Sequence, residues 1–142
     1  MPRDISRLNG LVKVRKLLED QRRVELESLR EKEYAAKEKL FHLKSEKRWS
    51  QDQLEKNEKT SLYLSYLDNL SQQSLYQSNL IKELGINIEK ARQVLLDAAK
   101  SRKMVEKLLS REIKHYRQNM ATQERKHLDE IATIRFARDS MQ

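Results

Sequence analysis

The stretch YLSYLDNLSQQSLYQSNLIKELGINIEKARQVLLDAAKSRKMVEKLLSREIKHY, residues 63–116, decides the fold of this chain. Alternating steps of four and three residues along it meet mostly apolar side chains. These positions are Tyr63, Leu67, Leu70, Ser74, Gln77, Ile81, Leu84, Ile88, Ala91, Leu95, Ala98, Arg102, Val105, Leu109, Glu112 and Tyr116. A repeat of about 3.5 residues keeps a narrow seam facing a partner helix over many turns. The stretch therefore predicts a long coiled-coil helix, and no proline interrupts it.

A second apolar stripe in the first third of the chain supplies the partner helix. Its members are Leu8, Leu11, Leu18, Leu26, Leu29, Ala36, Leu40 and Leu43. The stripe changes phase between Arg22 and Leu26, and we interpret this as a stutter that locally relaxes the supercoil. Asp4 or Ser6 can cap the start of this helix.

The apolar pattern thins after Lys44, and residues 56–61 are wholly polar. Asn57 tolerates the left-handed conformation that ends helices, and Thr60 or Ser61 can cap the next helix. We predict an all-α fold in which two long helices form an antiparallel coiled-coil hairpin, as a single domain over residues 1–142. The helices are expected at about 5–56 and 61–138, with a turn at about 57–60. One continuous helix is the alternative, because no glycine forces a break.

The antiparallel arrangement predicts which positions face each other. Leu43 is expected opposite Gln73, and Leu11 opposite Val105. Residues 3–23 hold seven basic and three acidic side chains, and residues 100–117 hold seven and two. The same arrangement brings these basic segments together. Residues 113–138 are left without an intramolecular partner, and a lone helix of that length is marginal in water.

The composition suits a two-layer rod and excludes a thick core. Of the 142 residues 37% are charged, and the mean hydropathy is −0.91. No apolar run of 18 residues is present, so neither a secretory signal nor a membrane span is expected. The absence of cysteine excludes disulfides and thiolate metal sites. We expect a cytoplasmic protein.

The residue pattern argues against catalysis. His42, His115 and His127 are never three or four residues apart, so no helical metal pair forms. The chain has no glycine-rich phosphate loop and no glycine-flanked nucleophile. We predict that the protein is not an enzyme and binds neither a metal nor a cofactor.

Aromatic side chains gather around the predicted turn. They are Phe41, Trp49, Tyr63, Tyr66 and Tyr76. Such residues either pack the tip of the hairpin or contact another protein. Trp49 and Tyr66 lie off the main seam and are the better interface candidates.

Two further features leave alternatives open. The basic segments form either a solvated face or a binding site, and an acidic protein surface fits better than nucleic acid, because Tyr116 is the only aromatic nearby. Gly85, inside the second helix, indicates a close backbone approach, a bend or a tolerated glycine.

The C-terminal third carries an ordered motif string. It reads AAKSRKMVEKL at 98–108, then Tyr116, then QERKHLDEIA at 123–132. The string resembles the flagellar FliJ family, whose members carry A-x-K-x-R-K-x-x-E-K-L, a tyrosine and E-x-K-x-L-D-E-x-A on the second of two long helices. Residues 63–70 are similar to that family's start of helix two. The resemblance covers about residues 8–138.

The resemblance implies a component of the flagellar type III export apparatus that resembles the central stalk of rotary ATPases. Such proteins associate with the hexameric export ATPase ring and with the export gate protein FlhA. They help couple ATP hydrolysis and the proton motive force to export, and they handle empty export chaperones. The implied location is cytoplasmic and peripheral, at the inner-membrane basal body. The isolated chain is expected to be a monomer.

Two sets of binding residues follow from this resemblance and from the charges. The gate is expected to meet the hairpin end, at Leu43, Trp49, Tyr66, Leu70, Gln73 and Gln77. The ATPase ring is expected to meet the basic end, at Arg102, Lys103, Arg111, Lys114 and Arg117. Two alternatives are the equivalent stalk of a virulence-type secretion system and a scaffold coiled coil that binds an acidic protein, lipid or nucleic acid.

Overall fold

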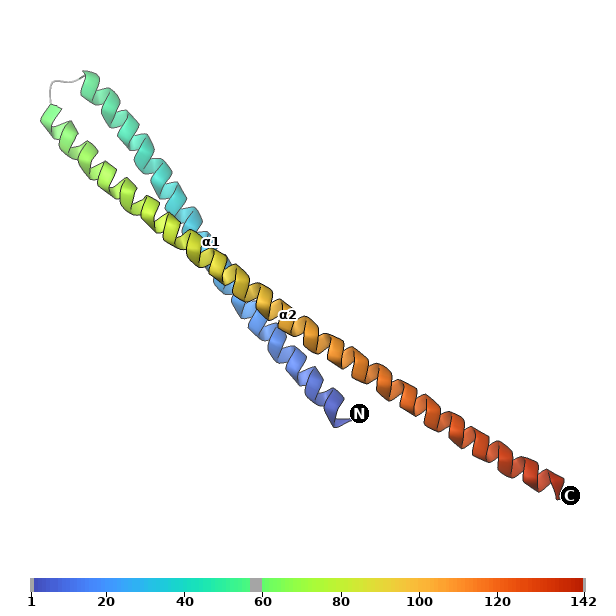
Figure 1. Ribbon diagram of the computed structural model, residues 1–142. Helices are drawn as coiled ribbons and strands as arrows, with labels where there is room; N and C mark the ends of the chain where they lie inside the picture. The colour runs from blue at the N-terminus through green and yellow to red at the C-terminus, as the bar shows by residue number, and fades with distance from the viewer. Residues whose placement is uncertain (1, 57–59, 142) are drawn as a thin grey trace. The chain divides into compact units, whose positions relative to one another are not determined.

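The structure is a computed structural model that describes residues 2–56 and 60–141. It consists of two α-helices, α1 at Arg3–Lys56 and α2 at Thr60–Ser140 (Figure 1). The chain runs in opposite directions along them, so the predicted antiparallel pair with a longer second helix is confirmed. The alternative of one continuous helix is wrong. The predicted turn falls mostly on residues 57–59, which lie outside the described residues.

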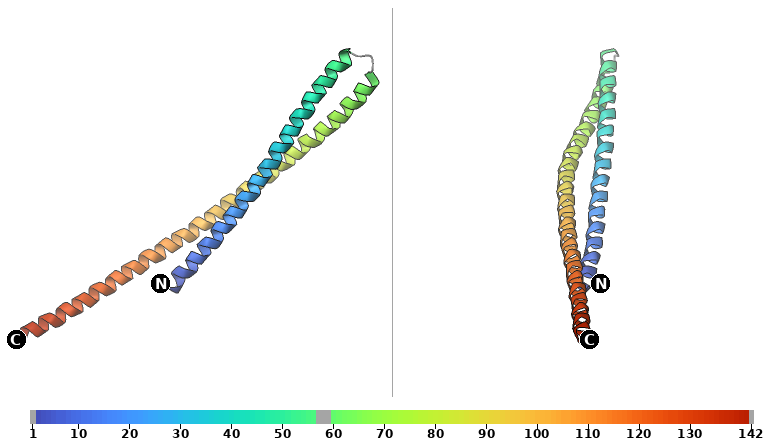
Figure 2. Two further views of the ribbon diagram at one scale, coloured as in Figure 1. Left: turned by 180° about the vertical axis from the view of Figure 1, so that it is seen from behind. Right: turned by 90° about the vertical axis from the view of Figure 1, so that its right-hand side faces the viewer.

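The chain divides into two compact units. Unit 1 comprises Met1–Leu17 and Ala99–Gln142, and unit 2 comprises Leu18–Ala98. In each unit a segment of α1 lies beside a segment of α2 (Figure 2). The expectation of a single domain over residues 1–142 stays a prediction.

The heptad seam of α2 is confirmed from Tyr63 to Leu109. Every predicted position in this range is buried or half-buried, and Leu70, Leu84 and Ala98 are among the most deeply covered. Glu112 and Tyr116 are exposed, so the prediction is wrong for the last two positions. The physical reason is the start of α1 at Arg3. Only the first turns of α1 lie beside Glu112, where Asp4 and Arg7 share a groove with it, and α1 begins too late to cover Tyr116.

The seam of α1 is regular, and the predicted stutter is wrong. Buried and half-buried positions alternate by three and four residues without a break. The positions that follow this spacing are Ile5, Leu8, Val12, Arg15, Glu19, Arg22, Leu26, Leu29, Glu33, Ala36, Leu40, Leu43, Lys47, Ser50 and Leu54. Leu18, which belongs to the predicted stripe, and Gln53 are half-buried beside them. The apolar pattern breaks at Arg15, Glu19 and Arg22 because long charged side chains occupy seam positions there, where their aliphatic stems can be covered. Leu11, assigned to the predicted stripe, is exposed.

The pairing of the helices agrees with the prediction to within one helical turn. In unit 1, Leu8 and Leu11 line one groove together with Leu108. In unit 2, Ala36 shares a groove with Leu80 and Leu84. The buried leucines along the seam specify such a register, since each covered leucine contributes about 1.5–3 kcal/mol.

Gly85 lies inside α2, and we interpret it as a tolerated glycine; the suggested bend at this position stays a prediction. It is exposed, and a Cβ placed on it meets no other atom within 4 Å. Its φ angle is not positive. The suggestion of a close backbone approach is therefore wrong.

We expect Gly85→Ala to raise the free energy of unfolding by about 1 kcal/mol, because alanine loses less backbone entropy in a helix than glycine. Urea unfolding followed by circular dichroism measures the change. The neighbouring Leu84→Ala serves as the contrast, since loss of a buried leucine lowers stability by about 2–5 kcal/mol. A loss of stability in Gly85→Ala would contradict this interpretation.

Candidate partner-binding surfaces

The six residues predicted at the hairpin end divide into two groups. Trp49, Tyr66 and Gln73 are exposed on unit 2. The other three, Leu43, Leu70 and Gln77, are buried in the seam. While the helices remain packed, the buried Leu43 and Leu70 set the spacing of α1 and α2 and do not reach a partner, whereas Gln77 lies at the base of a groove. Their role as direct contacts stays a prediction.

A groove runs between α1 and α2 in unit 2. It has two sections, which are joined because Lys39 and Gln77 line both of them. One section, of ≈ 390 Å³, is lined by Lys39, Asn69, Gln72, Gln73, Tyr76 and Gln77. The other, of ≈ 330 Å³, is lined by Lys32, Ala35, Ala36, Lys39, Gln77, Leu80 and Leu84. We call these residues the unit 2 groove. It has an amide-rich section and an apolar section, so it offers both hydrogen bonds and apolar contact to a partner.

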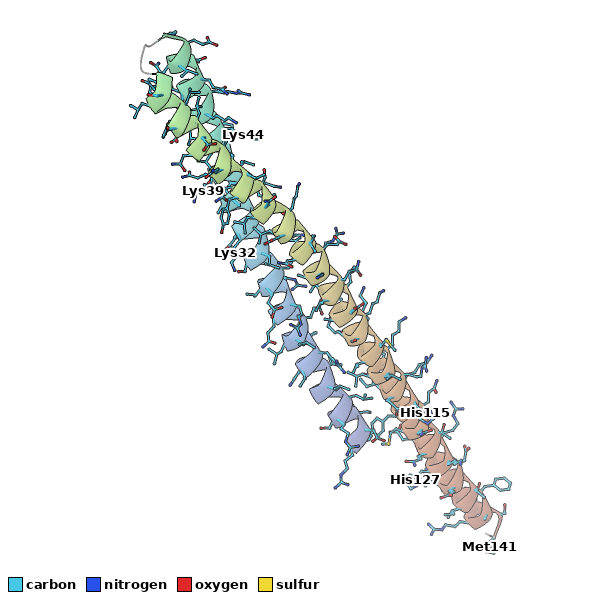
Figure 3. All side chains as sticks on the ribbon, turned by 60° about the vertical axis from the view of Figure 1, so that its left-hand side comes forward. Lys32, Lys39, Lys44, His115, His127 and Met141 are labelled. Carbon is cyan, nitrogen blue, oxygen red and sulfur yellow. The ribbon has the colours of Figure 1, made fainter. Side chains whose placement is uncertain are left out.

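Two lysines on α1 line the unit 2 groove, and Figure 3 labels both of them. Within residues 2–56 and 60–141, neither Lys32 nor Lys39 forms an ion pair. By contrast, the Nζ atom of Lys37 lies 3.0 Å from Oε1 of Glu33. The two unpaired ammonium groups stand one heptad apart, so they are available to carboxylates of a partner. Neither lysine is among the binding residues predicted from the sequence. The signal for them is the alanine pair at residues 35 and 36, where small side chains leave room between the helices.

Tyr66 links the two helices at this end of unit 2. Its hydroxyl donates a hydrogen bond of 3.1 Å to Oε2 of Glu46 on α1. The hydrogen bond to Glu46 raises the pKa of Tyr66, and desolvation and the negative charge of Glu46 add to the shift. The ring remains 42% exposed, so Tyr66 braces the helix pair and also presents an aromatic surface.

The basic residues concentrate in one part of unit 1. Residues 1–17 and 99–117, which we call the basic surface, contain twelve Lys and Arg but only three Asp and Glu. Residues 118–142 contain four of each kind. The two basic segments that we predicted to come together thus lie in the same compact unit. The exceptions are Arg22 and Arg23 at the end of the first segment, which belong to unit 2.

The five predicted ring-binding residues all lie in the basic surface. Lys103, Arg111, Lys114 and Arg117 are exposed. Arg102 is half-buried at a seam position, and its Nη1 lies 2.9 Å from Oε1 of Glu106. The exposed four are therefore free to face a partner, while Arg102 is engaged within unit 1.

The last part of α2 extends past the start of α1. All residues from Lys114 to Met141 are exposed, including the apolar Met120, Leu128 and Ile131. Figure 3 labels His127 and Met141 on this extension. This extension is helical to Ser140, and α1 covers none of its side chains.

The described residues contain no cluster of three or more side chains that could bind a metal ion, and His42, His115 and His127 are all exposed. Neither described helix has an apolar stretch long enough to cross a bilayer.

We expect the hydroxyl of Tyr66 to lose its proton at a higher pH than that of an ordinary tyrosine, because its pKa is raised. Because its pKa is raised on folding, the bond to Glu46 stabilises the fold at pH values below the ordinary tyrosine pKa. That contribution is lost as pH rises through the raised value. The difference in tyrosinate absorbance between the wild type and Tyr66→Phe measures the midpoint.

Glu46→Gln tests this expectation, and Glu38→Gln is its control. Glu46→Gln removes the charged acceptor, so the Tyr66 midpoint falls. Glu38 accepts a hydrogen bond from Tyr34 instead, so Glu38→Gln leaves the Tyr66 midpoint in place. An unchanged midpoint in Glu46→Gln would show that the cross-helix bond is absent in solution.

Comparison with models of known protein families found a match over most of the chain. The family model described as "Flagellar FliJ protein" matches residues 4–140, which is nearly the whole chain and includes both helices. Neither the search of curated proteins nor the search of solved structures found a match.

Proposed function

Because the chain belongs to the flagellar FliJ family and is thus a flagellar export-related protein, we propose that it is a non-enzymatic coiled-coil stalk of the flagellar type III export apparatus, which binds the export ATPase ring and the export gate. The family match over residues 4–140 is the observation that carries the proposal.

The basic surface is the proposed contact with the ATPase ring. Its twelve basic residues against three acidic ones attract an acidic surface over several ångströms and orient the encounter. Arg111, Lys114 and Arg117 are exposed on α2 and need no rearrangement to meet carboxylates. The exposed extension of α2 supplies further surface for the interior of a ring.

The unit 2 groove and its surroundings are the proposed contact with the gate protein FlhA. Gln73 lines the groove, and Tyr66 and Trp49 present exposed aromatic rings on the same unit. Aromatic anchors beside hydrogen-bonding amides are typical of protein interfaces. Leu43, Leu70 and Gln77 support this surface from beneath by holding α1 and α2 together.

The remaining parts of the proposal come from the family. The protein helps to couple ATP hydrolysis and the proton motive force to export, and it handles empty export chaperones. It acts in the cytoplasm, peripheral to the membrane at the basal body, and is a monomer when isolated. The assignment of the ring to unit 1 and of the gate to unit 2 follows the family.

We expect the combined charge reversal of Arg111, Lys114 and Arg117 to glutamate to weaken association with the ATPase ring, because it replaces three exposed cations by anions. Co-purification with the ATPase, repeated at rising salt, measures the effect, since salt screens exposed charges. The matched control reverses Lys44, Lys82 and Lys90, three exposed lysines of unit 2. Equal co-purification of both variants would remove the basic surface from the proposal.

We expect Tyr66→Ala combined with Gln73→Ala to reduce binding to FlhA while circular dichroism stays helical, because both side chains are exposed. Leu70→Ala serves as the contrast. Leu70 is only 3% exposed, so its truncation lowers the free energy of unfolding by about 2–5 kcal/mol. Full FlhA binding by the Tyr66/Gln73 variant would show that the gate contact lies elsewhere.

A further inference from the structure

The lining of the unit 2 groove carries positive charge and no negative charge. Lys32 and Lys39, both exposed, contribute two ammonium groups (Figure 3). The other lining residues are amides, alanines, leucines and one tyrosine. A partner that docks in this groove therefore meets two cations that no carboxylate of the lining balances.

The carboxylates on the same flank of α1 are already engaged. This flank has charged residues at intervals of seven, which are Glu25, Lys32, Lys39 and Glu46. Oε2 of Glu25 lies 3.1 Å from Nη1 of Arg22, and Oε2 of Glu46 accepts the hydrogen bond of Tyr66. The two lysines between these glutamates form no ion pair among residues 2–56 and 60–141. Their charge is therefore available to a partner.

The charge balance of unit 2 narrows the class of partner. The unit contains fourteen basic and fifteen acidic residues. Anionic membranes and nucleic acids are held by clusters of basic residues, and two lysines on a balanced unit do not form such a cluster. A second copy of this chain is disfavoured, because it would bring together two molecules with a net charge of +8 each. An acidic segment of another protein needs only the two lysines.

The distance between the two lysines sets the spacing of the carboxylates in such a segment. Lys32 and Lys39 are seven residues apart on α1, and seven residues of an α-helix rise by about 10 Å. One exposed ion pair contributes little by itself. Two carboxylates about 10 Å apart, which pair with both lysines at once, distinguish the segment from one with a single acidic residue.

The apolar section of the groove adds a second requirement. Ala35 and Ala36 have no side chain beyond Cβ, so space is left over Leu80 and Leu84. An apolar side chain of the segment fills this space and leaves water there. The amides of the other section both donate and accept hydrogen bonds, so they suit the polar groups at the other end of the segment.

We propose that the unit 2 groove binds an acidic segment of the gate protein, in which two carboxylates about 10 Å apart pair with Lys32 and Lys39 and an apolar side chain enters the space over Leu80. This inference rests on the proposed function, because it deepens the assignment of the gate contact to unit 2. It makes the two lysines the residues that select the partner by its charge.

The test compares two pairs of lysines on α1. The combined reversal Lys32→Glu and Lys39→Glu weakens binding to FlhA about tenfold or more, because it sets carboxylates against carboxylates. The matched control is Lys37→Glu with Lys44→Glu. These two lysines are exposed and also one heptad apart, but they directly follow seam residues instead of preceding them, so they lie on the other flank. The control leaves the affinity unchanged, and interferometry at low and high salt measures both variants.

A second variant keeps both lysines in place. Ala35 stands three residues after Lys32 and four before Lys39, so the carboxylate of Ala35→Glu reaches both ammonium groups within α1. It occupies the place of the partner and weakens FlhA binding about threefold or more. The helix is retained, because glutamate four residues before lysine is a favourable order. Circular dichroism checks that all variants are folded, and unchanged affinity in a folded Ala35→Glu variant contradicts the proposal.

Cross-linking identifies the carboxylates of the partner. A carbodiimide joins an amine to a carboxylate that touches it, so mass spectrometry of the treated complex with FlhA reports links through Lys32 and Lys39. Changing the linked carboxylates of FlhA to lysine restores binding to the Lys32/Lys39 reversal. Links through Lys37 and Lys44 alone, or no rescue by the exchanged charges, overturn the proposal.

The outcomes separate this inference from the proposed function. If the Lys32/Lys39 reversal binds FlhA like the wild type while Tyr66→Ala with Gln73→Ala does not, the gate contact stands and the acidic segment is overturned. If the wild type does not bind FlhA, the gate assignment fails and the inference fails with it. A wild-type dimer, or binding to phosphatidylglycerol vesicles, that the reversal abolishes assigns the groove to a second copy or to a membrane, and either result also overturns the proposal.

Discussion

The apolar seam between α1 and α2 is the interaction on which the rest of this protein depends. In each unit one helix segment covers one other, so the side chains that leave water lie on the two facing stripes. Leu26, Leu43, Leu70 and Leu84 are covered in this way in unit 2, and Ile5, Val12 and Val105 in unit 1. Because so few positions are buried, nearly every other side chain is surface, and function has to be carried by that surface.

The seam is not uniformly apolar. Ser50 is fully buried, and neither its hydroxyl nor that of Ser74 has a hydrogen-bond partner among the described residues. In unit 1, the buried Nε atom of Arg15 also has no hydrogen-bond partner among the described residues. A buried polar group without a partner costs about 1–3 kcal/mol. These positions weaken the helix pair locally while the leucines on either side hold its register.

Charge separates the two units as clearly as packing does. Unit 1 contains sixteen basic and seven acidic residues, whereas unit 2 contains fourteen and fifteen. Unit 1 therefore carries a net charge of +9 and unit 2 one of −1, which together give the +8 of the chain. Each unit also has a groove between its helices, so the same two-helix geometry presents different chemistry. Unit 2 offers amides and two unpaired lysines, and unit 1 offers three leucines within a positive field.

The sequence alone predicted the long coiled-coil helix, because a seam repeated every 3.5 residues from Tyr63 to Leu109 is buried against a partner helix. The tertiary structure decided that this partner is α1 of the same chain, which excludes one continuous helix. The sequence also located the basic surface, since charge counts need no coordinates. The spacing also predicted that Leu43, Leu70 and Gln77 lie on the facing stripes and that Tyr66 lies off them, and the structure confirms this. Only the tertiary structure decided how deeply each of these side chains is covered. It likewise revealed that Glu19 and Ser50 occupy the seam, and that Leu11 and Leu108 flank a groove. The physical reason is that heptad spacing predicts which residues share a face of one helix. How much of that face is covered depends on where the other helix begins and on the size of the side chains opposite.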